Sequence, residues 1–163
     1  MATQRRSSPA KSRTPDAIAL LKADHRQVKE WFGAFDKTES RSKKQQLATH
    51  ICDALTVHAT IEEEIFYPAF IEATGDKALH HEAVVEHAGA KKLIAEIQGM
   101  SSEDDYFDAK VTVLAEMIKH HVKEEEQPGG MFAEARKSAM DLASLGEQLQ
   151  ARKKELQARA MAA

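Results

Sequence analysis

Apolar residues recur along this chain at three- and four-residue steps, the spacing that places side chains on one face of an α-helix. The first series follows the cap sequence Thr14-Pro15-Asp16 and ends near Phe35. Similar series predict helices over residues 41–73, 76–98, 105–126 and 138–161, and each break between them contains Gly, Pro or Ser. Pro68 predicts a kink in the second helix, because proline has no N–H to give to the carbonyl of Glu64.

The composition supports a single all-α domain. The chain has 163 residues, of which 42% are hydrophobic and 30% charged, and this is enough for one buried core. Seven glycines, four prolines and few aromatic residues leave little material for strands or long loops. We therefore expect a disordered basic tail over residues 1–14, a helical bundle over residues 15–135 and an additional C-terminal helix over residues 136–163.

The two ends of the chain bear on its partners. The tail carries four basic residues and no acid, a pattern more typical of a disordered segment than of an arm that binds nucleic acid. The last helix has a thin apolar stripe, made of Leu142, Leu145, Leu149 and Leu156. Such a stripe either packs on the outside of the bundle or binds a protein partner or a second copy of the chain.

The expected location is the cytoplasm. No apolar run approaches the length of a membrane span, and no apolar segment follows the basic residues near the N-terminus as it would in a signal peptide. Cys52 is the only cysteine, so no internal disulfide is possible, and its neighbours are typical of helix packing. We expect no membrane and no nucleic acid among the partners.

The candidate chemistry begins with His58 and Glu62, which are four residues apart and therefore lie on one face of a helix. A single pair of this kind is common by chance on surface helices. Here it is repeated as His121 and Glu125, and two such helices facing each other would offer nitrogen and oxygen donors to a metal ion. This mixed donor set suits iron or manganese.

The two halves of the chain also resemble each other. When His25 is aligned with His87, the next ligand candidates, His58 and His121, follow 33 and 34 residues later. The same helical hairpin therefore occurs twice in the sequence. A two-fold arrangement would gather four histidines with Glu62 and Glu125, a set that fits two metal ions better than one. The two glutamates are candidate bridges between the ions, because a buried carboxylate without a cation costs several kcal/mol or takes up a proton.

The tight turn at residues 73–76 gives a check on depth. Helices joined by a tight turn run antiparallel, so residues equally far from the turn lie at the same level. Glu62 and His87 are each eleven residues from the turn, and we expect them to meet.

Other polar residues are weaker candidates. Glu86 is either a further metal ligand or a hydrogen-bond partner, and Tyr67 either reaches the metal or packs as a rim aromatic. The glutamates that flank the ligands are expected in solvent or as hydrogen-bond partners of the ligands; they are Glu63, Glu64, Glu124 and Glu126. The remaining histidines fall outside the repeat and are not expected to bind metal; they are His50, His80, His81 and His120. His80 and His81 follow a turn, where solvated side chains are common.

With these residues in place, the chain resembles the hemerythrin-like proteins of the bacterial HHE cation-binding family. The ordered series is His25, His58-x-x-x-Glu62, His87 and His121-x-x-x-Glu125, and the likeness covers about residues 16–135. The resemblance implies an up-down-up-down four-helix bundle. It also implies a non-haem centre of two iron ions (Fe2+/Fe3+), oxo- or hydroxo-bridged and open to O2, NO or peroxide, with manganese or zinc as substitutes.

One departure from that family changes the expected chemistry. Oxygen-carrying hemerythrins have a further histidine one turn before the third-helix ligand, where this chain has Ala83, so one iron lacks a nitrogen. Glu86, Tyr67 or water are candidates for that position. Three functions stay open: a di-iron protein that binds or senses a small ligand, a peroxide-decomposing or iron-oxidising enzyme at the same centre, and a metal-free helical interaction module.

Overall fold

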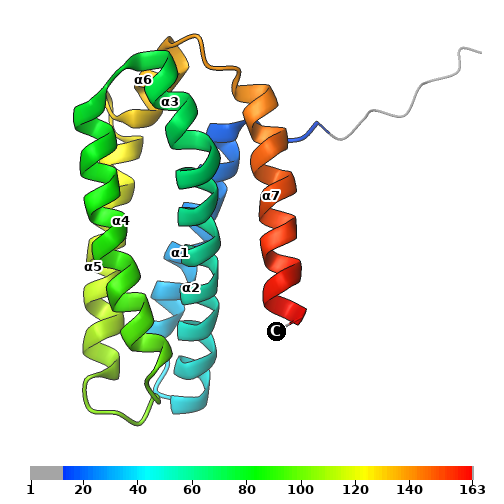
Figure 1. The fold of residues 1–163 in the computed structure, drawn as a ribbon. Coiled ribbons are helices and arrows are strands. Elements are labelled where there is room, and N and C mark those ends of the chain that lie inside the picture. The colour runs from blue at the N-terminus through cyan, green and yellow to red at the C-terminus, as the bar shows by residue number, and fades with distance from the viewer. Residues whose placement is uncertain (1–12, 163) are drawn as a thin grey trace, which may run out of the picture.

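The structure, a computed structural model, describes residues 13–162, and within them it contains helices and no strand. Four long helical segments run up, down, up and down to form a bundle (Figure 1). They are α1 (Ala17–Lys37), α2 (Arg41–Ile61) with its continuation, α4 (Lys77–Gln98) and α5 (Phe107–Glu126). The predicted all-α bundle is confirmed. The predicted basic tail, residues 1–14, falls almost wholly outside the described residues.

Side-chain caps define where three of these helices begin. The carboxylate of Asp16 accepts a hydrogen bond from the backbone N–H of Ala19 at 2.8 Å, and Ser40 and Asp76 cap α2 and α4 in the same way. Such a cap satisfies a backbone donor that the first turn leaves free. Just before Asp76, Gly75 adopts a φ of 66°, a left-handed conformation that favours glycine and reverses the chain.

In the second long segment, where the sequence predicts a kink at Pro68, the structure has a wider helical turn just before this residue. The segment continues from α2 through a π-helical turn, η1 (Glu62–Phe66), into α3 (Tyr67–Thr74). The N–H of Tyr67 donates to the carbonyl of Glu62, one residue further back than in an α-helix. Because Pro68 leaves the normal hydrogen-bond ladder incomplete, the chain takes this wider turn, and it does so beginning at Glu62.

The buried side chains form two apolar clusters along the bundle. One contains Leu21, Ile61 and Ala83, and the other contains Val28, Leu55 and Ala90. Helices α1, α2 and α4 each pass from one cluster to the other. A predicted histidine lies on each helix between the two clusters; these residues are His25, His58 and His87. The bundle therefore has a polar layer between two apolar ones.

Two further helices complete the fold (Figure 1). After the break at Pro128-Gly129-Gly130, the short helix α6 (Met131–Lys137) buries Met131 and Phe132 against the bundle. Helix α7 (Leu142–Ala162) then packs along α1, α2 and η1, with Leu145 and Leu149 buried. Among the described residues, no helix combines the length and the apolar character that a membrane crossing requires.

Candidate metal centre

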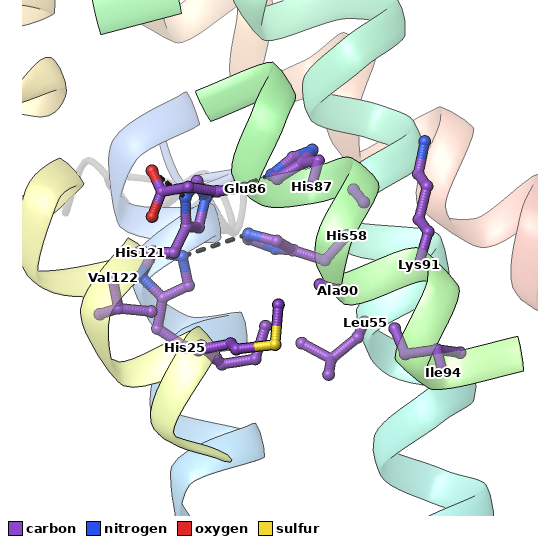
Figure 2. A pocket seen from close by; sticks show the side chains of 13 residues that line it. His25, Leu55, His58, Glu86, His87, Ala90, Lys91, Ile94, His121 and Val122 are labelled. Atoms are coloured by element: carbon purple, nitrogen blue, oxygen red, sulfur yellow. Dashed lines mark hydrogen bonds and ion pairs between the residues drawn. The ribbon is translucent and has the colours of Figure 1, made fainter. Parts of the chain in front are cut away.

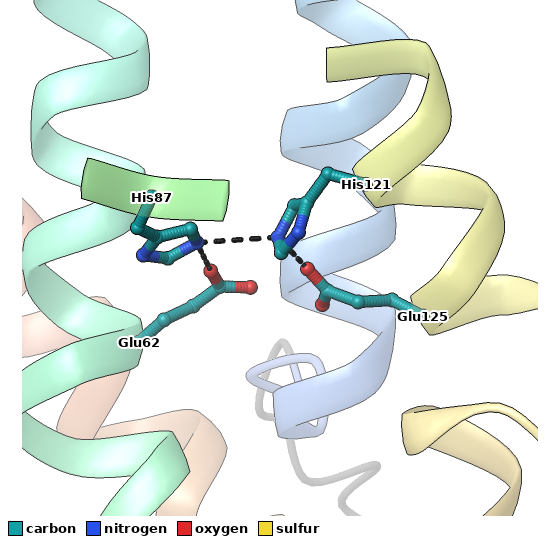
Figure 3. A group of neighbouring side chains, drawn as sticks. All are labelled: Glu62, His87, His121 and Glu125. Atoms are coloured by element: carbon teal, nitrogen blue, oxygen red, sulfur yellow. Dashed lines mark hydrogen bonds and ion pairs between the residues drawn. The ribbon is translucent and has the colours of Figure 1, made fainter. Parts of the chain in front are cut away.

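The polar layer contains all six residues that the repeated pattern predicts as ligands. Each is almost completely buried, with exposed fractions from 0% for Glu62 to 8% for His25. Their donor atoms fall into two groups, in each of which the atoms lie within 4.8 Å of one another. One group is His25, His58 and Glu62, and the other is Glu62, His87, His121 and Glu125 (Figure 3).

Glu62 is the residue that joins the two groups. One of its oxygens, Oε1, lies 3.1 Å from Nε2 of His58, and the other, Oε2, lies 3.1 Å from Nε2 of His87. The expected meeting of Glu62 and His87 is therefore present. Glu125, the other candidate bridge, contacts His121 and is grouped only with the second set.

The histidines meet in pairs through their Nε2 atoms. The distance between these atoms is 3.1 Å for His25 and His58, and 3.2 Å for His87 and His121. Two donors that each lie about 2.1 Å from one metal ion, at a right angle, would be about 3.0 Å apart. The observed spacing matches that of two ligands of one ion, and it is also the spacing of an N–H···N hydrogen bond.

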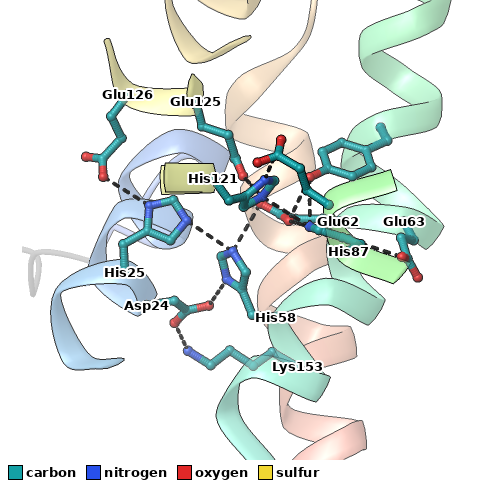
Figure 4. Close-up of polar contacts among 12 residues, drawn as sticks. Asp24, His25, His58, Glu62, Glu63, His87, His121, Glu125, Glu126 and Lys153 are labelled. Atoms are coloured by element: carbon teal, nitrogen blue, oxygen red, sulfur yellow. Dashed lines mark hydrogen bonds and ion pairs between the residues drawn. The ribbon is translucent and has the colours of Figure 1, made fainter. Parts of the chain in front are cut away.

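The other ring nitrogen of each histidine contacts a carboxylate (Figure 4). The four contacts are His25 with Glu126 at 3.1 Å, His58 with Asp24 at 3.0 Å, His87 with Glu63 at 3.1 Å and His121 with Glu86 at 3.4 Å. In each pair, Nδ1–H donates to the carboxylate. This hydrogen bond orients the ring and turns Nε2 inward, as in the outer hydrogen bonds of protein metal sites.

This frame of carboxylates follows the two-fold repeat of the hairpins. The acid that precedes the first histidine of a hairpin holds the second histidine of the same hairpin: Asp24 holds His58, and Glu86 holds His121. The acid that follows the predicted glutamate ligand holds a histidine of the other hairpin: Glu63 holds His87, and Glu126 holds His25. Of these four acids, Asp24 is one that the sequence reading missed.

Charges within the layer perturb the histidines strongly. Burial alone would lower the pKa of His58, but the charge of Glu62 raises it to about 10. Burial likewise opposes the charged form of His121, yet Glu125 raises its pKa to about 11. Burial and the charge of His58 lower the pKa of His25 to about 3, so the positive charge concentrates on part of the cluster. Two buried glutamates therefore attract positive charge to this layer.

Buried oxygen atoms test whether metal ions fit. Oε1 of Glu62 and both carboxylate oxygens of Glu125 are buried without a hydrogen-bond partner in the described chain. Each histidine pair also brings two Nε2 atoms together, and when Nδ1 of both rings carries a proton, the contact needs a further proton or a cation between the two Nε2 atoms. A cation between them would relieve both features. The residues therefore fit the metal ions that the donor pattern implies.

The weaker candidates lie around this cluster. The hydroxyl of Tyr67 donates to Oε2 of Glu62 at 3.0 Å and lies 3.1 Å from Nε2 of His87, so the side chain reaches the ligands and is also 99% buried. Glu86 lies at Nδ1 of His121, on the outer side of that ring. The four histidines that fall outside the repeat belong to neither ligand group; they are His50, His80, His81 and His120.

An apolar cavity of ≈ 30 Å³ adjoins the cluster (Figure 2). Its walls combine histidines of both ligand groups with apolar residues of α2, α4 and α5, which include Leu55, Ala59, Ala90, Ile94, Met117, Ile118 and Val122. A space of this size accommodates a molecule of about the size of water. The cavity therefore provides room for a small, weakly polar ligand next to the polar layer.

The fold and the polar layer define a class of protein: a four-helix bundle whose interior has a buried histidine and glutamate cluster able to hold metal ions. The model of one family, described as the hemerythrin HHE cation binding domain, matches residues 16–128. The chain belongs to this family, and the resemblance drawn from the motifs is confirmed.

Two known proteins are similar to the chain. The crystal structure of the Rv2633c homolog from Mycobacterium kansasii, a hemerythrin HHE cation binding domain-containing protein, has a TM-score of 0.74 and 21% identity and matches 90% of each chain. A protein described as a DNA nickase, from Nostoc sp. (strain PCC 7120 / SAG 25.82 / UTEX 2576), is 29% identical over 107 residues. That region is 66% of this chain and 30% of the relative. The first likeness concerns the fold, and the second covers less than a third of its relative.

Proposed function

We propose that this protein is a non-haem di-iron protein that binds or senses O2, NO or peroxide. The observation that carries the proposal is the meeting of four Nε2 atoms and two glutamates in one buried layer. His25 and His58 would hold one ion, and His87, His121 and Glu125 would hold the other; Glu62 belongs to both groups. Nitrogen and carboxylate donors suit iron, and manganese or zinc are the substitutes to test.

The chemistry that bound iron supplies is electron exchange with the small ligand. The protein's own residues orient the ligands and supply a proton. The four carboxylates at Nδ1 keep each ring in the orientation that points Nε2 inward. Burial and the charge of Glu62 raise the pKa of Tyr67 well above its usual value, so the phenol keeps its proton and donates it in a hydrogen bond.

The apolar cavity supports a small ligand. Its walls between α2, α4 and α5 offer aliphatic and thioether groups and few hydrogen-bond partners. A diatomic molecule loses little hydration on entering such a space, whereas a charged substrate would lose much more. The size and polarity of the cavity therefore favour a small neutral molecule.

The test is the iron content and the absorption spectrum of the purified protein. We expect about two irons per chain and the charge-transfer absorption of an iron pair. His58→Ala and Glu62→Ala should each lower the iron content, whereas His50→Ala, on the same helix but outside the cluster, should not. Unchanged iron content in His58→Ala and Glu62→Ala would refute the assignment.

A second candidate is peroxide breakdown at the same centre, and the position of Tyr67 favours it. A neutral phenol hydroxyl within hydrogen-bond distance of both Glu62 and His87 can donate a hydrogen bond to an oxygen leaving group and so stabilise its developing charge. The iron-loaded protein would then release O2 from peroxide continuously, and the His121→Ala variant would not. A loaded protein that is inert toward peroxide removes this candidate and leaves ligand binding.

A further inference from the structure

A second small cavity reaches the candidate centre between α4 and α5. Its volume is ≈ 10 Å³, and four glutamates line it: Glu82, Glu86, Glu124 and Glu125. His121 forms another part of its wall, so that two members of the second ligand group, His121 and Glu125, line the cavity. Ala83 also lines it, and its small side chain takes up little of this space.

The glutamates differ in burial in a graded way. Glu82 is exposed to solvent, Glu124 is half-buried and the side chain of Glu86 is 19% exposed. Glu125 is only 2% exposed. A series of carboxylates therefore leads from the surface to the metal ligands.

The inner end of this series has buried carboxylate oxygens that accept no hydrogen bond. They are both oxygens of Glu125 and Oε2 of Glu86, among residues 13–162. The positive groups near them are His121, which forms an ion pair with Oε1 of Glu125, and His120, whose Nε2 lies 3.6 Å from Oε2 of Glu86. The ion pair of Glu125 with His121 involves Oε1, which leaves Oε2 without any contact of this kind. Because a buried carboxylate oxygen is costly without a partner, the cavity is suited to a cation.

The apolar cavity on the other side of the ligands has the opposite character. Its charged wall residues other than histidines are Glu86, which lines both cavities, and Lys91, which forms an ion pair with Glu63 at 2.5 Å. A divalent cation would lose most of its hydration there and would find one carboxylate, beside a lysine, where the smaller cavity offers four carboxylates. The two cavities therefore differ in the kind of molecule that each admits.

We propose that Glu82, Glu86 and Glu124 form an entry site that binds a divalent cation from solution and passes it to Glu125 and the buried centre. The proposal rests on the proposed function, because it requires a cation at that centre. Carboxylates near the surface raise the local concentration of cations and increase the rate of association, an effect that salt weakens. The glutamates of the entry site hold the ion only in transit, so they change the rate of loading and not the final occupancy.

The test follows uptake of ferrous ion, without oxygen, by the full chain after its metal has been removed. The test variant is Glu82→Gln/Glu124→Gln, which leaves Glu86 to hold His121. The matched control is Glu103→Gln/Glu116→Gln, which removes the same charge at two exposed positions outside the cavity. We expect the test variant to load about tenfold more slowly at low salt, with a smaller difference at high salt and the same final iron content.

A single change, Glu82→Lys, provides a second variant at the exposed mouth of the cavity, where folding is unaffected, and it should load at least as slowly. Equal loading rates for the test variant, the control and the unmodified protein would overturn the entry site alone. A lower final iron content in the test variant would also overturn it, because Glu82 and Glu124 would then be resident ligands. If the unmodified protein takes up no iron, the proposed function fails and the entry site fails with it.

Discussion

Asp24 connects the candidate centre to the C-terminal helix, and it provides a sharp test of the carboxylate frame. One of its oxygens accepts from Nδ1 of His58 at 3.0 Å, and the other forms an ion pair with Lys153 of α7 (Figure 4). The side chain of Asp24 is only 13% exposed. Asp24→Asn keeps the size of this side chain and removes its charge. We expect the ion held by His25 and His58 to bind more weakly.

The expected size of this effect follows from the contacts. Loss of an outer hydrogen-bond partner of a metal ligand costs about 10- to 100-fold in affinity. The amide oxygen of the new asparagine still accepts from Nδ1–H, so about tenfold is expected, or about 1.4 kcal/mol. The second ion should be unaffected, because its histidines are held by Glu63 and Glu86.

The assay is a metal titration against a competing chelator of known affinity. Asp24→Asn should show one weakened site and one unchanged site. Asp36→Asn, an exposed change on the same helix, is the matched control and should match the unmodified protein. Lys153→Met should weaken the same site less, because its ion pair is partly exposed. If Asp24→Asn binds both ions with full affinity while its melting temperature is unchanged, the carboxylate does not position His58.

Three further predictions concern stability and reactivity. Removal of the metal with a strong chelator should lower the melting temperature by about 5–10 °C. The reason is that a ligand at a hundred times its Kd stabilises the folded state by about 2.7 kcal/mol. An unchanged melting temperature would favour the metal-free interaction module. Gly146→Ala should cost about 1–3 kcal/mol in unfolding measurements, because its Cβ would collide with the backbone of Pro15 and Asp16, whereas Gly33→Ala, with open space around it, should not destabilise. Burial and the charge of Asp53 raise the pKa of Cys52 to about 11. The folded protein should therefore react slowly with a thiol reagent near neutral pH, and faster as the pH rises toward that value. Rapid reaction at neutral pH would contradict the buried, neutral thiol.

The grouping of the six side chains could be predicted because helical periodicity acts over short distances. A four-residue step places His58 and Glu62 on one face whatever the rest of the chain does. The tight turn then places Glu62 level with His87, and the two meet at 3.1 Å. The repeat of the hairpin extended the same reasoning to the second half.

The partners of the ligands were harder to predict. Asp24 lies 34 residues from His58 in sequence, and their contact depends on how α1 and α2 are rotated about their axes. A signal was present, since an acid precedes the first histidine of both hairpins, in Asp24-His25 and Glu86-His87. Spacing alone cannot tell which ring such an acid holds.

Periodicity and the repeat determined from the sequence alone that this chain is helical and that six donors lie on inward faces. The tertiary structure decided which donors lie together, that Glu62, the first residue of a π-helical turn, belongs to both groups, and which carboxylate contacts each Nδ1. It also decided that α6 places Phe132 against His25, with the rings 5.8 Å apart. The physical reason is that hydrogen bonds within a helix act between near neighbours in sequence, whereas these contacts depend on the packing of helices that are distant in sequence.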